Sequence, residues 1–327
     1  MATDARGQAY ASGFPAEERI ALDAATGKGP IGLLKAGLTI MRGVTQARSA
    51  LDRLGADVVV GFGGYPSAPA LLAAITTRRP VVIHEQNSVL GRTNRYLAPS
   101  VQAIGTAFPT LARAPAKVRD RLKLIGNPVR ADIQALYERT YQAPNADGPI
   151  HVLVTGGSQG ARLLSETTPK ALAALPQALR ARLKVQQQSR AENVHAARKI
   201  YQEAGIEAEV APFFSNMAER LAMAHLVIGR SGASTCSELA VAGLPSVLIP
   251  LKIATDDHQT LNAKALKDAG AATVIAEDDV TVEALVAALE PLLADPTKLT
   301  TMSAAARSVA LPQATLSLAD LVEATAR

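Results

Sequence analysis

A turn of small residues followed by a single carboxylate is the stretch whose residue types best suit ligand binding. Residues 229–243 read Gly-Arg-Ser-Gly-Ala-Ser-Thr-Cys-Ser-Glu-Leu-Ala-Val-Ala-Gly, between apolar runs at 226–228 and 245–250. This order predicts strand, turn, short helix and strand, with open backbone N–H groups at the helix start, where phosphate binds well. Glu238, about one turn further on, has the acceptor oxygens to bind two neighbouring sugar hydroxyls. Together these features indicate a nucleotide ligand. A capping box, with Ser234 or Thr235 as the cap and Glu238 closing back on it, explains the same residues without a ligand.

Two other polar turns stand at similar places in the chain. Residues 155–161 read Thr-Gly-Gly-Ser-Gln-Gly-Ala after an apolar run, and their glycines allow a phosphate to approach the backbone closely. The turn matches neither the dinucleotide fingerprint nor the Walker P-loop. Residues 256–263, Asp-Asp-His-Gln-Thr-Leu-Asn-Ala, suit sugar hydroxyls, although an acidic helix start explains the two aspartates equally well. We do not assign His258 a catalytic role, because it and Asp257 are adjacent on a helix and do not face each other.

The elements that must position these turns alternate between strand and helix. Apolar runs predict strands at 58–60, 80–83, 101–105, 122–125, 150–154, 184–188, 208–213, 225–228, 245–251 and 272–275. Helical patterns separate most of these runs, which is typical of βαβ units and parallel sheets. Functional side chains should then gather at the carboxyl ends of the strands. Residues 131–148, which include Pro144 and Gly148, are expected to connect two domains.

Composition limits the classes of function. The chain has 327 residues, 48% of them apolar, which is enough for two domains with substantial cores. Its single cysteine, Cys236, excludes an internal disulfide and favours a reducing compartment. One Cys and five scattered His residues do not assemble a zinc site, and we predict no metal and no cofactor. A formal charge of +5 suits anionic partners. Nucleic acid is not expected, because Lys/Arg runs with interleaved aromatics are missing.

One apolar segment could bring the chain to a membrane surface. Residues 31–41 read Ile-Gly-Leu-Leu-Lys-Ala-Gly-Leu-Thr-Ile-Met, with Lys28, Lys35 and Arg42 around them. The segment is too short to cross a bilayer, and the N-terminus lacks the apolar region of a signal peptide. It can lie among lipid headgroups as an amphipathic helix, or pack on the protein's own core, which is the commoner arrangement.

Six short motifs in one order carry a resemblance to a known family. They are Gly63-Gly64-Tyr65, His84-Glu85-Gln86-Asn87, Gly126-Asn127-Pro128-Val129-Arg130, residues 156–161, residues 230–238 and residues 257–263. Together they span most of the chain and closely resemble the MurG family. Its members are the UDP-N-acetylglucosamine:undecaprenyl-diphospho-muramoylpentapeptide N-acetylglucosaminyltransferases of peptidoglycan synthesis.

The resemblance implies a GT-B architecture, in which two Rossmann-like, doubly wound domains face each other across a cleft. Residues 1–128 would form the N-terminal domain, which binds the acceptor and faces the membrane. Residues 129–149 would be a linker, and residues 150–305 the UDP-GlcNAc-binding domain. Residues 306–327 would be C-terminal helices, for which packing back on the N-terminal domain is one option.

The resemblance also implies an activity and a donor site. The family inverts the anomeric centre without a metal: the muramoyl C4 hydroxyl of the lipid-linked acceptor, lipid I, attacks C1 of GlcNAc and UDP leaves. Asn87 would lie at the cleft edge and Arg130 after the hinge, Ser158 would bind phosphate and the Phe214 backbone would read uracil. Ala233, Ser234, Thr235, Cys236, Ser237 and Glu238 would hold phosphates and ribose, and Gln259 would contact the GlcNAc hydroxyls.

The N-terminus departs from the family pattern. Members begin with a strand and a Gly-Gly-Thr-Gly-Gly-His turn, whose His is the favoured general base, and this chain has no such motif. The sequence from Asp4 onward resembles the segment after the family's second strand, so the expectation is that a βαβ portion of about 30 residues or more is missing. The catalytic residue is therefore left unknown. His84 is nearest by location, but a His at a strand end is more often structural.

Alternative functions stay open at the level of sequence. A related GT-B lipid glycosyltransferase is one, although residues 84–87 and 127–130 favour the MurG family. A catalytically dead, truncated UDP-sugar binder is another, favoured by the missing base. The resemblance implies UDP-GlcNAc, undecaprenyl-linked lipid I and an anionic membrane surface as partners, with cell-wall synthesis proteins as a further option. It implies peripheral attachment at the cytoplasmic face of the inner membrane.

Overall fold

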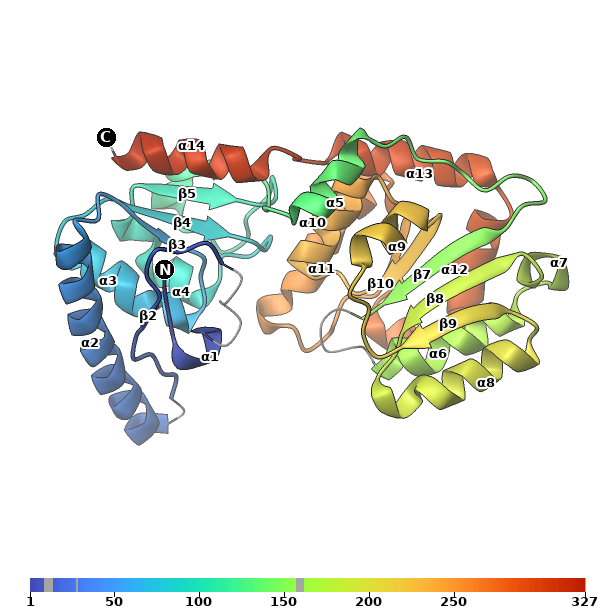
Figure 1. Cartoon of the computed structure of the whole chain (residues 1–327), viewed down its shortest axis with the longest axis horizontal. Helices are drawn as coiled ribbons and strands as arrows, with labels where there is room; N and C mark the ends of the chain where they lie inside the picture. The colour runs from blue at the N-terminus through green and yellow to red at the C-terminus, as the bar shows by residue number, and fades with distance from the viewer. Residues whose placement is uncertain (9–13, 28, 157–161, 327) are drawn as a thin grey trace. The chain divides into compact units, whose positions relative to one another are not determined.

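The chain forms two α/β units, which the computed structural model describes over residues 1–8, 14–27, 29–156 and 162–326. Unit 1 comprises Met1–Gly126 together with Gln313–Arg327, and unit 2 comprises Asn127–Pro312. The expected linker, residues 129–149, therefore belongs to unit 2, and the last helix folds with unit 1. Figure 1 shows the order of elements along the chain.

Unit 1 contains two parallel sheets and the helices that cover them. The smaller sheet pairs β1 (Ala2–Thr3) with β2 (Ile20–Ala21). The larger one has the order β3-β4-β5-β6, with every neighbouring pair parallel. Its strands are β3 (Val59–Gly61), β4 (Val81–Glu85), β5 (Ala103–Thr106) and β6 (Leu122–Leu124). The α-helices of the unit are α1 (Ala5–Gln8), α2 (Gly29–Leu54), α3 (Ala68–Thr76), α4 (Arg92–Leu97) and α14 (Ala314–Ala326).

Unit 2 is built on one parallel sheet of six strands in the order β12-β11-β10-β7-β8-β9. Its strands are β7 (Ile150–Thr155), β8 (Leu183–Gln188), β9 (Glu207–Ala211), β10 (Leu226–Gly229), β11 (Ser246–Leu248) and β12 (Ala272–Val274). Its α-helices are α5 (Ala131–Gln134), α6 (Arg162–Ala174), α7 (Gln177–Arg180), α8 (Val194–Glu203), α9 (Met217–Met223), α10 (Ala233–Ala242), α11 (His258–Ala269), α12 (Val282–Leu293) and α13 (Pro296–Ser308). The predicted parallel α/β architecture is confirmed.

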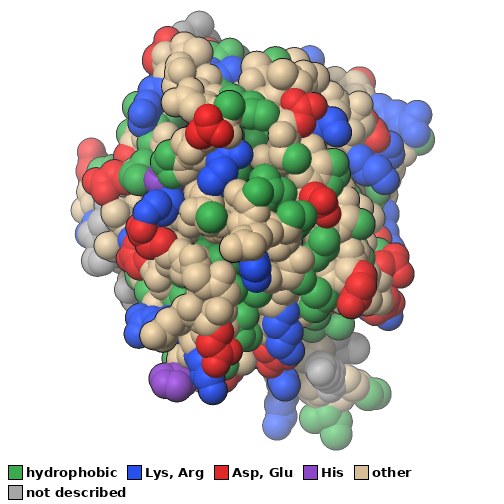
Figure 2. All heavy atoms as spheres, turned by 90° about the vertical axis from the view of Figure 1, so that its right-hand side faces the viewer, with side chains coloured by type: hydrophobic (Ala, Val, Ile, Leu, Met, Phe, Trp, Pro, Cys, Tyr) green, Lys and Arg blue, Asp and Glu red, His purple; other side chains and the backbone are tan. Residues whose placement is uncertain are grey.

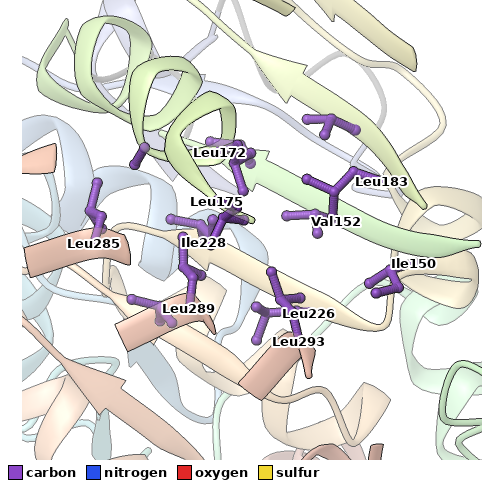
Figure 3. Packing of buried hydrophobic residues seen from close by; sticks show 14 of the residues in the cluster. Ile150, Val152, Leu172, Leu175, Leu183, Leu226, Ile228, Leu285, Leu289 and Leu293 are labelled. Carbon is purple, nitrogen blue, oxygen red and sulfur yellow. The ribbon is translucent and has the colours of Figure 1, made fainter. Parts of the chain in front are cut away.

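Aliphatic side chains fill the core of unit 2. Those on β7 and β10, such as Val152 and Ile228, pack against α12, where Leu285 and Leu289 are fully buried (Figure 3). Strands buried on both faces are expected to be runs of Val, Ile and Leu. The core therefore holds β7 and β10 side by side, and with them the turns at their carboxyl ends.

The segment expected to connect the domains is partly helical. Residues 131–134 form α5, a short 3₁₀ helix (Ala135–Glu138) follows, and both pack against α10. Arg307 of α13 donates hydrogen bonds to the carbonyls of Tyr137 and Arg139. These contacts fix Arg130, at the start of α5, relative to α10.

Candidate nucleotide-sugar site

A cavity of about 1070 Å³ opens where the strand order of unit 2 reverses. The chain proceeds from β7 to β8 and β9 on one side, and from β10 to β11 and β12 on the other, so β7 and β10 flank the switch point. Open α/β sheets bind ligands in the crevice at such a point, outside the carboxyl ends of the strands. Predicted donor residues among those lining the cavity are Arg130, Phe214, Ala233, Ser234, Thr235, Glu238 and Gln259.

Helix α10 presents an uncapped N-terminus to this cavity. Its N-cap residue is Gly232, which has no side chain to accept a hydrogen bond from the first turn. Ser234 and Thr235 lie inside the helix, so the capping-box explanation of these residues is wrong. Backbone N–H groups at a helix start attract anions through their unpaired donors and the helix dipole. The first turn of α10 can therefore bind a phosphate group.

Glu238 supplies a carboxylate one turn further along α10. The side chain is only partly exposed, and in the described part of the chain no group donates a hydrogen bond to it. Burial raises the pKa of Glu238, while the charge of Arg130 opposes that shift. A carboxylate in this setting gains from two neighbouring hydroxyl donors, such as those of a ribose.

A largely buried ion pair also lines the cavity. Arg230 forms an ion pair with Glu277, and the two side chains are 9% and 21% exposed. The Arg230 guanidinium also donates to the carbonyl oxygens of Ile249 (3.1 Å) and Pro250 (3.3 Å). The other Glu277 oxygen accepts from the Lys252 backbone N–H at 2.7 Å. Arg230 is thus neutralised within the protein and positions residues 249–252 rather than binding a phosphate.

Two oxygens of Gln259, the backbone carbonyl and the side-chain Oε1, accept hydrogen bonds that fix the residue. Its carbonyl accepts from the Ser231 hydroxyl at 2.8 Å, and Oε1 accepts from the Leu251 N–H at 3.0 Å. No described group accepts from its amide nitrogen, which can therefore donate to a sugar hydroxyl. Nearby, His258 Nδ1 contacts the Thr255 carbonyl at 2.7 Å, so its ring makes a local contact at the start of α11.

The segment after β9 forms the side of the cavity expected to receive the base. The Phe214 side chain is 5% exposed and lies under Arg220, whose Cζ is 3.6 Å from the ring centroid. Arg220 in turn makes two hydrogen bonds to Glu209, of 2.6 and 2.8 Å. This packing fixes the backbone at Phe214, while the neighbouring Phe213 is 68% exposed and also lines the cavity.

Some predicted donor residues do not lie on this cavity. The Cys236 side chain is 1% exposed, and burial raises the pKa of its thiol to about 12, so it is a neutral core group. Ser237 does not line the cavity either. Ser158 is outside the described residues. Asn87 belongs to unit 1, where its backbone and amide nitrogens lie 3.1 and 3.3 Å from Glu85 Oε1.

Sequence reasoning missed several residues that line the cavity. Gln188 is the last residue of β8, Arg190 follows that strand, and Glu277 follows β12. Gln188 is fixed by the Thr155 hydroxyl, which donates to Gln188 Oε1 at 3.0 Å. Their position at or just after the ends of predicted strands was an available signal, since parallel strands end at one edge of the sheet.

His84, the nearest candidate for a general base, has a structural setting. The side chain is 1% exposed, and its Nε2 lies 2.8 Å from the Gly126 carbonyl. Burial lowers the pKa of His84. We therefore assign it to the packing of β4 against the end of unit 1.

The fold and the cavity define a class of protein: two parallel α/β units, one with a cavity at its switch point that is lined by a helix N-terminus and a carboxylate, are the architecture of GT-B glycosyltransferases. Residues 6–106 match the glycosyltransferase family 28 N-terminal domain, and residues 151–321 match its C-terminal domain.

The chain belongs to the MurG family within these enzymes. It is 58% identical over 329 aligned residues to the UDP-N-acetylglucosamine--N-acetylmuramyl-(pentapeptide) pyrophosphoryl-undecaprenol N-acetylglucosamine transferase of Caulobacter vibrioides, covering 100% of this chain and 91% of that protein. The protein of the same description from Phenylobacterium zucineum is 55% identical, covering 100% of this chain and 90% of its own length. The crystal structure of Acinetobacter baumannii MurG superposes with a TM-score of 0.79 at 32% identity, covering 99% of this chain and 90% of that one.

Proposed function

We propose that this protein transfers GlcNAc from UDP-GlcNAc to the muramoyl C4 hydroxyl of undecaprenyl-diphospho-MurNAc-pentapeptide, converting lipid I to lipid II in peptidoglycan synthesis. The observation that carries the proposal is the placement of the open α10 N-terminus and the Glu238 carboxylate in one cavity. These groups match the diphosphate and the ribose of a nucleotide sugar. The relatives from Caulobacter and Phenylobacterium are named for this reaction.

The donor is held by residues of unit 2 in this proposal. The first turn of α10, from Ala233 to Thr235, binds the diphosphate. Ser158, which lies outside the described residues, stays a predicted phosphate contact. Glu238 accepts from the ribose hydroxyls, the Phe214 backbone binds uracil and Gln259 donates to GlcNAc. Arg130, 55% exposed at its side chain, supplies a positive charge at the rim. Asn87, on unit 1, stays a predicted donor contact.

In this proposal, unit 2 contributes to the reaction by stabilising the leaving group, UDP. As the acceptor hydroxyl attacks C1 and the bond to UDP breaks, negative charge builds on the β-phosphate. The N–H groups and dipole of α10 are fixed before the reaction and stabilise this charge as it develops. Such a site raises the rate by preferential binding of the transition state.

Transfer of radiolabelled GlcNAc from UDP-GlcNAc to a lipid I analogue tests the proposal. We expect Glu238→Gln to reduce transfer by at least about tenfold, since removal of a charged hydrogen-bond partner costs about 1.5–3 kcal/mol. Glu283→Gln, an exposed change on α12, is the matched control and should leave transfer unchanged. Binding of UDP-GlcNAc without transfer would instead favour a nucleotide-sugar binder, and transfer to diacylglycerol a related lipid glycosyltransferase.

We also propose that α2 places the enzyme on the anionic cytoplasmic face of the inner membrane. Four apolar side chains on its first half are largely exposed: Ile31 (72%), Leu34 (67%), Leu38 (61%) and Met41 (64%). Lys35 and Arg42 are exposed on the same helix. An apolar face with basic neighbours binds the headgroup region of anionic lipid. No described helix is both long and apolar enough to span a bilayer.

Sedimentation with vesicles of anionic phospholipid tests this surface. We expect Leu34→Glu and Leu38→Glu to reduce binding strongly without unfolding the protein, because both side chains are already exposed. Leu316→Glu on α14, where the side chain is 60% exposed, is the matched control. Equal loss of binding in the control would show that a single negative charge acts anywhere on unit 1, and would contradict the α2 surface.

A further inference from the structure

One arginine of α13 closes the end of the segment that begins at Arg130. From Arg130 the chain runs directly into α5 and the 3₁₀ helix that follows it. At the far end of this segment, the Arg307 guanidinium donates to the carbonyls of Tyr137 and Arg139. A longer contact of 3.4 Å joins it to the Leu136 carbonyl. The last carbonyls of a helix lack partners within the helix and carry partial negative charge, so a cation that donates to them stabilises that end.

The same side chain packs on the end of α10. This helix ends at Gly243, whose φ of 65° and ψ of 44° are left-handed. A Cβ added at Gly243 would lie 2.6 Å from Arg307 Nε and 2.9 Å from its Cγ, so the arginine lies directly against this glycine. Ser303, one turn before Arg307 on α13, donates to the Gly243 carbonyl at 2.6 Å. Two side chains of α13 therefore hold the C-terminal end of α10.

The two segments that meet at Arg307 carry opposite charges at the donor cavity. Arg130, at the start of one, and Glu238, on α10, both line that cavity. Between these ends, α5 and the 3₁₀ helix pack against α10. Burial raises the pKa of Glu238, the charge of Arg130 lowers it and the charge of Asp132 raises it. The carboxyl of Glu238 is thus sensitive to where the residues around α5 lie.

Other charged side chains of the cavity are compensated by close partners. Three of its arginines form ion pairs of 3.0 Å or less: Arg162 with Glu166, Arg190 with Glu192 and Arg230 with Glu277. Arg130 lies 3.8 Å from Asp132, and each of these two side chains is 55% exposed. The charge that faces Glu238 therefore depends on the placement of α5 more than on the other walls.

We propose that Arg307 is a positioning residue for the donor site. By joining the carbonyl end of residues 130–139 to the C-terminal end of α10, it sets the spacing between Arg130 and Glu238, and with it the affinity for UDP-GlcNAc. Arg307 does not line the cavity, so it acts through these two residues. The inference rests on the proposed function, in which both contact the donor. Lysine is a poor substitute, because an ammonium lacks the planar fork that reaches several carbonyls at once.

Calorimetric titration of UDP-GlcNAc into full-length variants measures the effect. We expect Arg307→Met to weaken binding about tenfold and Arg307→Lys, which keeps the charge, about threefold. Arg182→Lys is the matched control, because Arg182 also donates to two carbonyls of unit 2, those of Gly148 (2.9 Å) and Asn145 (2.7 Å), and does not line the cavity. The control should bind UDP-GlcNAc as tightly as wild type.

A double-mutant cycle with Arg130 separates positioning from general stability. If Arg307 acts by placing Arg130, Arg307→Met should weaken binding in the presence of Arg130 and change it little in the Arg130→Met background.

The pH dependence of binding gives a second readout of positioning. Because the charge of Arg130 lowers the pKa of Glu238, displacement of Arg130 lets that pKa rise. The ionised form that binds the donor is then lost earlier on acidification, so the acid midpoint of UDP-GlcNAc binding should move to higher pH in Arg307→Met. A purely stabilising side chain would leave this midpoint unchanged.

The outcomes distinguish this inference from the donor site itself. Wild-type affinity and an unshifted acid midpoint in folded Arg307→Met would overturn the role of Arg307 and leave the donor site standing. An equal loss with and without Arg130 would likewise overturn it, since Arg307 would then support the fold alone. Failure of the wild-type chain to bind UDP-GlcNAc would contradict both. If circular dichroism shows Arg307→Met unfolded, the same comparisons with Arg307→Lys decide.

Discussion

The two units differ in how their parallel strands are joined into sheets. In unit 2, six parallel strands form one sheet, and the core side chains of β7 and β10 are closed in by α12. In unit 1, six strands are divided into sheets of two and four, and an apolar groove lies between the edges of β1 and β3. The pocket of unit 2 lies at a switch point, which exists only where neighbouring strands are held side by side.

Charge distribution adds to the contrast. On the face of the molecule shown in Figure 2, Lys and Arg side chains are interspersed with Asp and Glu. On α2 of unit 1, the exposed side chains from Ile31 to Met41 are instead apolar with basic neighbours. We accordingly place membrane contact on unit 1 and the donor on unit 2.

The largest effect is expected from breaking the buried ion pair of unit 2. Arg230→Ala leaves the partly buried Glu277 without its charged partner, and breaking a buried pair in this way costs about 3–5 kcal/mol. Chemical denaturation should show this loss, and UDP-GlcNAc binding should fall because residues 249–252 lose their support. Lys264→Met, which breaks the exposed pair of Lys264 with Asp268 (2.5 Å), is the control and should cost under about 1 kcal/mol.

Truncation of one leucine in each unit compares the two cores. Leu289→Ala in unit 2 removes a fully buried side chain and should cost about 3 kcal/mol. Leu54→Ala in unit 1 removes a side chain that is 50% exposed at the groove and should cost under about 1 kcal/mol. Equal costs in urea denaturation would mean that the groove is closed in solution.

A substitution at the α10 cap separates binding from stability. The backbone of Gly232 has φ −59° and ψ 152°, which other residues adopt readily, and the nearest heavy atom to an added Cβ is 3.9 Å away. Gly232→Asp should cap the helix and keep or slightly raise the melting temperature. Its carboxylate would occupy the anion site, so UDP affinity should fall about tenfold or more in a thermal-shift titration. Gly232→Ala, which adds no charge, is the control, and an equal loss there would contradict phosphate binding at α10.

A pH dependence should follow from Glu238. Because burial raises its pKa, the folded protein takes up this proton more readily than the unfolded chain. The carboxyl therefore favours folding at low pH, and this contribution is lost as the pH rises through the folded pKa. Donor binding needs the ionised form and should weaken on acidification at a higher pH than an ordinary Glu would give. Titrations of wild type and Glu238→Gln from about pH 8 down to about pH 4.5, a range that includes the ordinary Glu pKa, should show this step in wild type alone.

The parallel architecture could be predicted from the sequence because buried parallel strands are runs of Val, Ile and Leu. The run at 150–154, for example, became β7 (Ile150–Thr155). The starts of helices were harder to predict. Ser234 and Thr235 are residue types that often cap helices, but the N-cap residue of α10 is Gly232. Cys236 was one of the predicted donor contacts, but its position on α10 directs the side chain toward the core.

Long-range pairing explains most of what the sequence did not indicate. Glu277 follows Arg230 by 47 positions, and only the order β12-β11-β10 brings them together. The groove of unit 1 depends in the same way on how β1 and β3 are placed by Asp4 and Tyr65. No local sequence pattern predicts that Arg230 pairs with Glu277 or that Asp4 pairs with Tyr65.

Calorimetric titration of UDP-GlcNAc into the full chain is the decisive measurement for the donor site. Binding at one site per chain, competed by UDP and weakened about tenfold or more by Glu238→Gln but not by Glu283→Gln, is the result we predict. Binding of equal strength in wild type and Glu238→Gln, or no binding at all, would contradict a donor site built on α10.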